Sequence, residues 1–247
     1  SIAYERLAEG DAYLAELSGQ QKKPESLSDF KNVFNIVRKN YGEVTVSFGE
    51  PVMLSTLLDT HAPDWPHHQY DPETRPEWLG GLVDDLASQI LVNINKAAHA
   101  NPIALLSVAL LASPRQALDE HDLKAMLGVL KALLGASIYS DRVTVTDQSA
   151  DEIIAYGLAL EVIQRHRHDG GAIIKTDEHT AVLLSYFKNN LAHAMALSAW
   201  LACCYLNLRR LKRARLHELT RRVYPFLKTE LFLPWSDDSL APALDQT

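Results

Sequence analysis

Two short histidine clusters are the first residues in this chain whose types and spacing could do chemistry. His166 and His168 stand two residues apart beside Asp169, and His67 and His68 stand shortly before two acidic residues. Imidazole and carboxylate groups are common zinc ligands, but a zinc site needs three or four ligands held together. Neither cluster offers a clear third ligand, and the first lies in a Gly-rich turn. The spacing favours exposed histidines over a metal site.

A further histidine, His193, lies in a nearly uncharged stretch over residues 191–208. On an apolar helix, a histidine is more often a hydrogen-bonded core or interface residue than a general base, and both roles stay open here. A membrane span takes about 20 apolar residues, so this stretch is marginal as a span. A buried core helix is the favoured interpretation of the stretch.

Familiar catalytic and phosphate-binding motifs are absent from the sequence. It has no G-x-G-x-x-G, no G-x-x-x-x-G-K-[ST], no G-x-S-x-G and no H-E-x-x-H. Its two cysteines, Cys203 and Cys204, are neighbours, and adjacent cysteines rarely pair with each other. Together with the lack of C-x-x-C, this argues against a structural zinc site and indicates a reducing compartment.

Composition and charge narrow the classes of fold and partner. Hydrophobic residues make up 47% of the 247, which is enough for a packed core. The net charge of −7 argues against a general nucleic-acid binder. Residues 209–222 nevertheless carry seven Arg and Lys against one Glu. On an amphipathic helix such a run suits an anionic membrane surface, although an ordinary solvated helix face has the same composition.

Periodicity predicts a mainly helical chain with few strands. Residues 43–48 alternate apolar and polar side chains, which is typical of a half-buried strand, and residues 49–51 end it. Residues 172–174 follow a turn at 166–171 and are either a short strand or an extended connection. Asn101, Asp119 and either Ser149 or Asp151 are candidate helix caps. Helical patterns cover residues 7–17, 30–37, 82–99, 101–113, 119–134, 149–166 and 176–208.

Eight short stretches, spread in order over almost the whole chain, carry a family resemblance. They are residues 1–5 (SIAYE), 16–19, 23–27 (KPESL), 48–51 (FGEP), 71–79, 109–113 (ALLAS), 186–193 (YFKNNLAH) and 227–235. Each is weak alone, but together they resemble the membrane-bound bacterial glycerol-3-phosphate 1-O-acyltransferases. The first stretch looks like the end of that family's fourth acyltransferase block.

The resemblance implies a reaction, its partners and a location. The family transfers a fatty acyl group from acyl-acyl carrier protein (acyl-ACP) or acyl-CoA to the 1-hydroxyl of glycerol 3-phosphate, the first step of phospholipid synthesis. In the family, a His of an H-x-x-x-x-D motif acts as the general base and its Asp orients it. The resemblance implies no metal and no other cofactor. It also implies attachment to the cytoplasmic face of the bacterial inner membrane, here through residues 209–222.

This sequence departs from the family where catalysis requires a match. None of its ten histidines is followed by Asp five residues later, and the nearest pair, His68 and Glu73, lies in an unrelated Pro-rich context. The family's arginine-bearing phosphate block is missing as well. We therefore expect the catalytic pair to lie upstream of this chain and name no catalytic residue. Ser1, Ile2 and Tyr4 match the fourth block and are the candidate substrate-binding residues.

The resulting domain prediction has three parts. Residues 1–58 should complete an α/β acyltransferase domain with one or two strands. Residues 59–80 should be a connector rich in Pro, His and Trp, and residues 81–247 should be an all-α region. Two alternatives remain open: a helical module that docks on a membrane or an acyl carrier without catalysis, and an unrelated helical scaffold.

Overall fold

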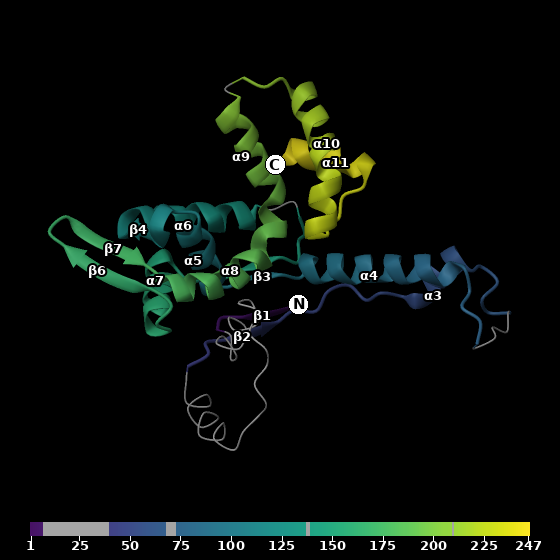
Figure 1. The fold of residues 1–247 in the computed structure, drawn as a ribbon, viewed down its shortest axis with the longest axis horizontal. Coiled ribbons are helices and arrows are strands. Elements are labelled where there is room, and N and C mark those ends of the chain that lie inside the picture. The colour runs from purple at the N-terminus through teal and green to yellow at the C-terminus, as the bar shows by residue number, and fades with distance from the viewer. Residues whose placement is uncertain (7–39, 68–72, 137–138, 209) are drawn as a thin grey trace, which may run out of the picture.

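A computed structural model describes residues 1–6, 40–67, 73–136, 139–208 and 210–247 of the protein. Most of these residues are helical, which confirms the mainly α class (Figure 1). The helices predicted over residues 7–17 and 30–37 lie outside the described residues. The elements, in chain order, are β1 (Ile2–Tyr4), β2 (Val44–Val46), α3 (Leu54–His61), α4 (Trp78–Lys96), β3 (His99–Ala100), α5 (Pro102–Leu111), the 3-10 helix η1 (Pro114–Gln116), β4 (Ala117–Asp119), α6 (Glu120–Gly135), β5 (Thr144–Val145), α7 (Ala150–Ala159), β6 (Gln164–His168), β7 (Gly171–Lys175), α8 (Glu178–Ala192), the 3-10 helix η2 (His193–Met195), α9 (Ala196–Asn207), α10 (Arg213–Leu231) and α11 (Asp237–Gln246).

The predicted strand over residues 43–48 is confirmed as β2, which pairs with β1 in antiparallel register, Ile2 opposite Val46. It is not half-buried, however. Val44 and Val46 are more than half exposed and Phe48 is 86% exposed. Alternation predicts which side chains share a face, but it does not say whether anything covers that face. Among the described residues, nothing covers this one.

The helices α3 and α4 form an arm that extends away from the rest of the fold (Figure 1). The connector predicted over residues 59–80 is shorter than expected, because residues 59–61 belong to α3 and residues 78–80 begin α4. The helix predicted to reach residue 99 ends at Lys96. Residues 99–100 instead form β3, which pairs with β5 in parallel.

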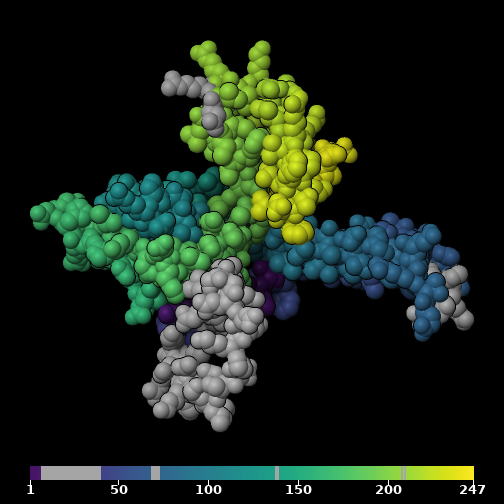
Figure 2. All heavy atoms as spheres, in the orientation of Figure 1, coloured from purple at the N-terminus to yellow at the C-terminus, as the bar shows by residue number. Residues whose placement is uncertain are grey.

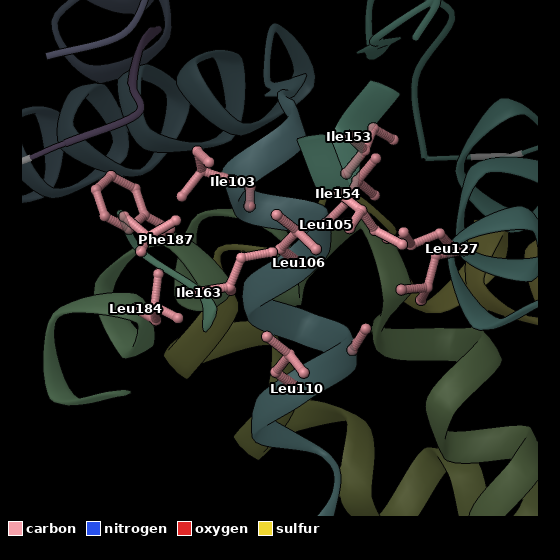
Figure 3. Close-up of a cluster of buried hydrophobic side chains, with 14 of the residues drawn as sticks. Ile103, Leu105, Leu106, Leu110, Leu127, Ile153, Ile154, Ile163, Leu184 and Phe187 are labelled. Atoms are coloured by element: carbon pink, nitrogen blue, oxygen red, sulfur yellow. The ribbon is translucent and has the colours of Figure 1, made fainter. Parts of the chain in front are cut away.

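Helix α5 is the centre of the main hydrophobic core. Asn101 caps it by accepting a 2.8 Å hydrogen bond from the Ala104 amide, and Pro102 occupies its first turn, which confirms the predicted start. Eight of its ten residues are buried, because apolar side chains surround it on all sides. Figure 3 shows the neighbours that enclose it: Leu127 from α6, Ile153 and Ile154 from α7, and Leu184 and Phe187 from α8.

A three-stranded antiparallel sheet, in the order β4-β7-β6, corrects the prediction that residues 81–247 are all-α. The helix predicted to reach residue 166 ends at Ala159, and residues 164–168 are β6. The sequence of this strand is Gln-Arg-His-Arg-His, which has no apolar side from which a strand could be predicted. Backbone pairing with β7 holds it, and Ile174 of β7 anchors the hairpin in the core.

The stretch over residues 176–208 is not one helix. The 3-10 turn η2 at His193–Met195 separates α8 from α9. A second core cluster joins α9 to α10 and α11, through Leu197, Leu216 and Leu240 among others. The buried-helix interpretation of residues 191–208 is half right, because one side of α9 is exposed. None of the described helices is both long and apolar enough to cross a bilayer.

Candidate functional site

Strand β1, which contains the predicted site residues Ile2 and Tyr4, is attached to the main core through Asn101. The Asn101 side-chain amide donates a 2.9 Å hydrogen bond to the Tyr4 carbonyl oxygen. The same side chain caps α5 through its oxygen, and Asn101 is only 3% exposed. One buried residue thus satisfies the first turn of the core helix and fixes the position of β1.

Glu5 provides a second attachment directly after the strand. Its carboxylate is 4% exposed and accepts a 2.6 Å hydrogen bond from the Glu43 amide. The Tyr156 hydroxyl of α7 donates to the same carboxylate oxygen. Burial, together with this hydrogen bond to Glu5, raises the pKa of Tyr156. The neutral tyrosine therefore remains a donor to Glu5 at every physiological pH.

Arg6 extends the same connection to the end of α7. Its guanidinium donates to the carbonyl oxygen of Leu160, 3.2 Å away, and to that of Asn40, 3.3 Å away. Leu160 is the residue at the C-terminal cap of α7, where carbonyl groups lack partners within the helix. A cation at this end also interacts favourably with the helix dipole.

A cavity of about 280 Å³ lies beside β1. It is where the start of the chain meets the Tyr186–His193 stretch, although almost 190 residues separate them in sequence. Apart from the α-amino group of Ser1, its lining carries no charged side chain, and the polar groups are hydroxyls, amides and imidazoles. The lining residues are Ser1, Ile2, Ala3, Ile94, Asn95, Ala98, His99, Tyr186, Asn189, Asn190 and His193.

His193 forms the bend between α8 and α9 at the base of this cavity. It is 5% exposed, and its Nε2 lies 3.0 Å from the carbonyl oxygen of Asn95, to which it donates. Burial lowers the pKa of His193 to about 4. The ring also meets Tyr139 edge to face at 4.9 Å. A neutral imidazole committed to a backbone carbonyl suits the core role rather than the general-base role.

Asn95 and His99 complete the polar wall. The Asn95 side chain donates a 2.8 Å hydrogen bond to the Leu231 carbonyl, which connects α4 to the end of α10. His99 lies 2.8 Å from the Thr144 hydroxyl, and burial lowers its pKa against the opposing charges of Glu5 and two other acids. These groups can hold a neutral hydroxyl or amide, and they form no acid–base pair of the kind that acyl transfer needs.

The predicted site residues are only partly brought together. Ser1 and Ile2 line the cavity. Tyr4 does not, and only its backbone carbonyl takes part, through Asn101. His68 lies outside the described residues, and His166 and His168 are exposed on β6. Across the part of the chain that the structure describes, no three His, Cys, Asp or Glu residues are grouped to hold a metal.

The sequence did not show that Glu5, Asn101 and Tyr156 fix β1, although it predicted Asn101 as a helix cap. Glu5 and Asn101 carried a partial signal, since an acid and a helix-capping Asn both require hydrogen-bond partners once they are buried. Tyr156 carried none, because its partner lies 151 residues away in sequence.

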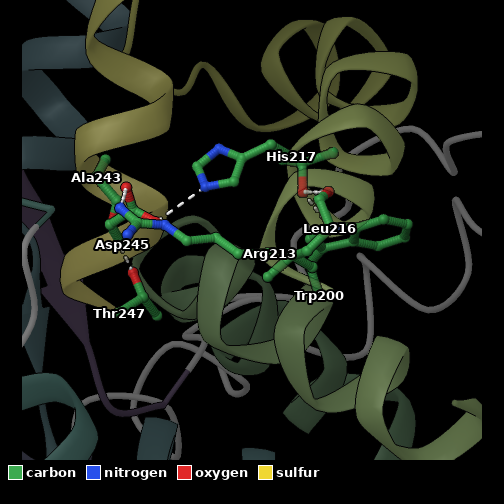
Figure 4. Close-up of polar contacts among 8 residues, drawn as sticks. Trp200, Arg213, Leu216, His217, Ala243, Asp245 and Thr247 are labelled. Carbon is green, nitrogen blue, oxygen red and sulfur yellow. Dashed lines mark hydrogen bonds and ion pairs between the residues drawn. The ribbon is translucent and has the colours of Figure 1, made fainter. Parts of the chain in front are cut away.

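The basic segment over residues 209–222 is largely helix α10, and several of its cations are paired. Arg213 and His217 both contact Asp245 of α11, His217 at 2.9 Å (Figure 4). The Arg213 guanidinium is the main cause of the lowered pKa of Asp245. Arg215 and Arg222 lie 2.6 and 2.7 Å from Glu218. The run therefore presents fewer uncompensated cations than its sequence suggests.

Comparison with known proteins identifies the family of this chain. The family model described as "Glycerol-3-phosphate acyltransferase C-terminal region" matches residues 13–247. Proteins named glycerol-3-phosphate acyltransferase are similar over the chain: 46% identical over 247 residues in Xanthomonas axonopodis pv. citri (strain 306), 44% over 246 in Xylella fastidiosa (strain M12) and 39% over 245 in Pseudomonas aeruginosa (strain LESB58).

Each of these alignments covers at least 99% of the chain but only 28–29% of the relative. The matched portion is the one that the family model describes as C-terminal. The chain belongs to the glycerol-3-phosphate acyltransferase family and corresponds to its C-terminal region.

Proposed function

We propose that this chain is the C-terminal part of an enzyme that transfers a fatty acyl group to the 1-hydroxyl of glycerol 3-phosphate. The acyl donor is acyl-ACP or acyl-CoA. The observation that carries the proposal is the family match over residues 13–247. Residues 1–5 lie before this match and resemble the family's fourth acyltransferase block. This resemblance extends the proposal to the start of the chain.

On this proposal, the general base and its Asp precede Ser1, and the 247 residues alone are inactive. The absence of H-x-x-x-x-D from the sequence supports this division. Ser1, Ile2 and Tyr4 belong to the acceptor side of the intact site. The role of the helical region is then to hold strand β1, with Ile2 and Tyr4, through the buried contacts of Glu5 and Asn101.

We also propose that the intact enzyme acts in phospholipid synthesis at the cytoplasmic face of the inner membrane. The acyl chain of the product is apolar, and the exposed cations among residues 210–222 suit anionic lipid headgroups. The same cations would suit an acidic acyl carrier. A docking module without catalysis is therefore the alternative.

An acyl-transfer assay tests the proposal. Glycerol 3-phosphate and palmitoyl-CoA are supplied to the 247-residue chain and to the full-length protein in detergent. Activity only in the full-length protein is the expected result. Activity in the short chain would place the base within it, and His68→Ala and His193→Ala would then locate it. No activity in either, under conditions where a relative is active, would leave the docking module as the better reading.

A further inference from the structure

Helix α9 is apolar on both of its sides. Leu197 and Cys204 lie on the buried side and pack in the second core cluster. The residues described as exposed on the other side have helical spacing i, i+3, i+4, i+7 and are all uncharged: Ala199, Ala202, Cys203 and Leu206. A helix at a protein–water boundary normally turns a polar side to the solvent. The exposed side of α9 therefore fits an apolar environment better than water.

The apolar exposure is greatest where α9 ends. Tyr205 is 51% exposed, Leu206 is 83% exposed and Leu208 is 44% exposed. Three large, exposed apolar side chains therefore fall within four residues at the end of one helix. We call the exposed side of α9 and these three residues the α9 tip.

Cations follow the α9 tip immediately. Arg210 and Lys212 are exposed, and the structure gives them no ion pair with any residue that it describes. Arg213 and Arg215, which come next, are paired with Asp245 and Glu218. The sequence has no Asp or Glu between residues 196 and 217. Uncompensated positive charge thus follows the α9 tip, and no acidic residue lies in the same segment of the sequence.

The tip also lies at an extremity of the molecule. The end of α9 and the start of α10 are at the opposite end of these helices from β1 (Figure 1), which lines the cavity. The space-filling view shows side chains of this connection projecting outward beyond the helices (Figure 2). A flat surface could therefore meet the tip without contacting the core or the sheet.

We propose that the α9 tip inserts into the headgroup layer of an anionic lipid membrane, with Arg210 and Lys212 at the phosphate level. Apolar side chains bordered by basic residues are the composition of interfacial membrane contacts. An acidic protein partner would satisfy the two cations but offers less to the apolar exposed side of α9, which spans about two turns from Ala199 to Leu206. The inference deepens the proposed membrane association and rests on it.

A single-site probe in the full-length protein tests the proposal. Leu206→Cys, with the native cysteines replaced, is labelled with an environment-sensitive fluorophore. Val129→Cys on α6 is the matched control, because Val129 is 59% exposed and lies on another part of the surface. Vesicles of phosphatidylethanolamine and phosphatidylglycerol are added, and vesicles with nitroxide-bearing acyl chains test insertion by quenching.

The expected result is a blue shift and quenching at position 206 and neither at position 129. Arg210→Gln with Lys212→Gln should lower the affinity for the vesicles about 25-fold, because each basic residue near the surface contributes roughly fivefold. High salt should weaken it too. A tip that responds equally to uncharged vesicles and to anionic ones would contradict the role of the two cations and overturn the proposal.

Vesicle flotation of the same labelled protein distinguishes insertion of the α9 tip from membrane association of the protein as a whole. If the protein floats but the fluorophore at position 206 does not respond, insertion of the α9 tip is overturned and membrane association still holds. A protein that does not float overturns both. Emission already shifted without vesicles would mean that another part of the protein covers the tip. A shift on adding acyl carrier protein alone would assign the tip to that partner. Either of these last results overturns lipid insertion.

Discussion

The Asn101 side chain donates a 2.9 Å hydrogen bond to the Tyr4 carbonyl while its oxygen caps helix α5. Strand β1 and the core helix therefore depend on one buried amide. A polar contact thus joins β1 to the hydrophobic core, while Ile2 and Tyr4 of the strand are 52% and 39% exposed and Ala3 is buried.

Asn101→Ala removes both contacts. Loss of the cap costs about 1 kcal/mol, and the unpaired Tyr4 carbonyl adds a cost of similar size. We expect the free energy of unfolding to fall by about 2 kcal/mol in urea titration. Asn101→Ser keeps an oxygen for the cap but lacks the amide NH2 group that donates to the Tyr4 carbonyl. It should lower global stability less while still increasing hydrogen exchange in β2, and equal losses from both variants would contradict the dual role.

Tyr156→Phe tests the second attachment of β1. The variant keeps the ring but leaves the buried Glu5 carboxylate with one donor fewer, at a cost of about 1–3 kcal/mol. Urea denaturation measures the loss. Tyr205→Phe, on an exposed ring, should stay within about 0.5 kcal/mol of the parent. If both variants behave alike, the Glu5 contact contributes nothing measurable.

The sequence predicted helix beginnings better than helix ends. Asn101, Asp119 and Ser149 cap their helices as expected, because a cap is a contact among residues two or three apart. Helix ends depended on distant partners. α4 stops at Lys96 because the following residues pair with β5, and the end predicted at residue 166 failed because β6 pairs with β7.

The cavity was not predictable for the same reason. Ser1 and Ile2 were named from the family block, but nothing in the spacing shows that they meet Asn95 and the Tyr186–His193 stretch. The sequence assigned no role to that stretch. The structure gives it one, because His193 bends the chain there and bonds to the Asn95 carbonyl.

His193 makes stability depend on pH in a defined window. Its pKa falls from about 6.5 in the unfolded chain to about 4 in the fold, because burial disfavours the imidazolium. Above pH 6.5 both states are neutral at this residue. Below it the unfolded state takes up the proton first, so stability is lost as pH falls toward 4, by about 3 kcal/mol in total.

His193→Gln should remove this loss, because glutamine can still donate to the Asn95 carbonyl but does not titrate. The measurement is the free energy of unfolding against pH from 7 to 4. His121→Gln, on an exposed histidine, is the control and should keep the slope of the parent. A slope unchanged in His193→Gln would assign the acid sensitivity to other groups.

Two helical glycines should respond oppositely to alanine. A Cβ on Gly157 of α7 would lie 2.6 Å from Leu106 Cδ1 and 2.9 Å from Ile163 Cδ1, in the fully packed core around α5. Overpacking of this kind costs about 1–3 kcal/mol. Gly128 of α6 is exposed, and its Cβ would meet no atom within 4 Å. There the gain in helix propensity should stabilise the protein by up to about 1 kcal/mol. Thermal unfolding of the two variants should therefore shift in opposite directions, whereas a stable Gly157→Ala would show that α7 can move away from α5 at little cost.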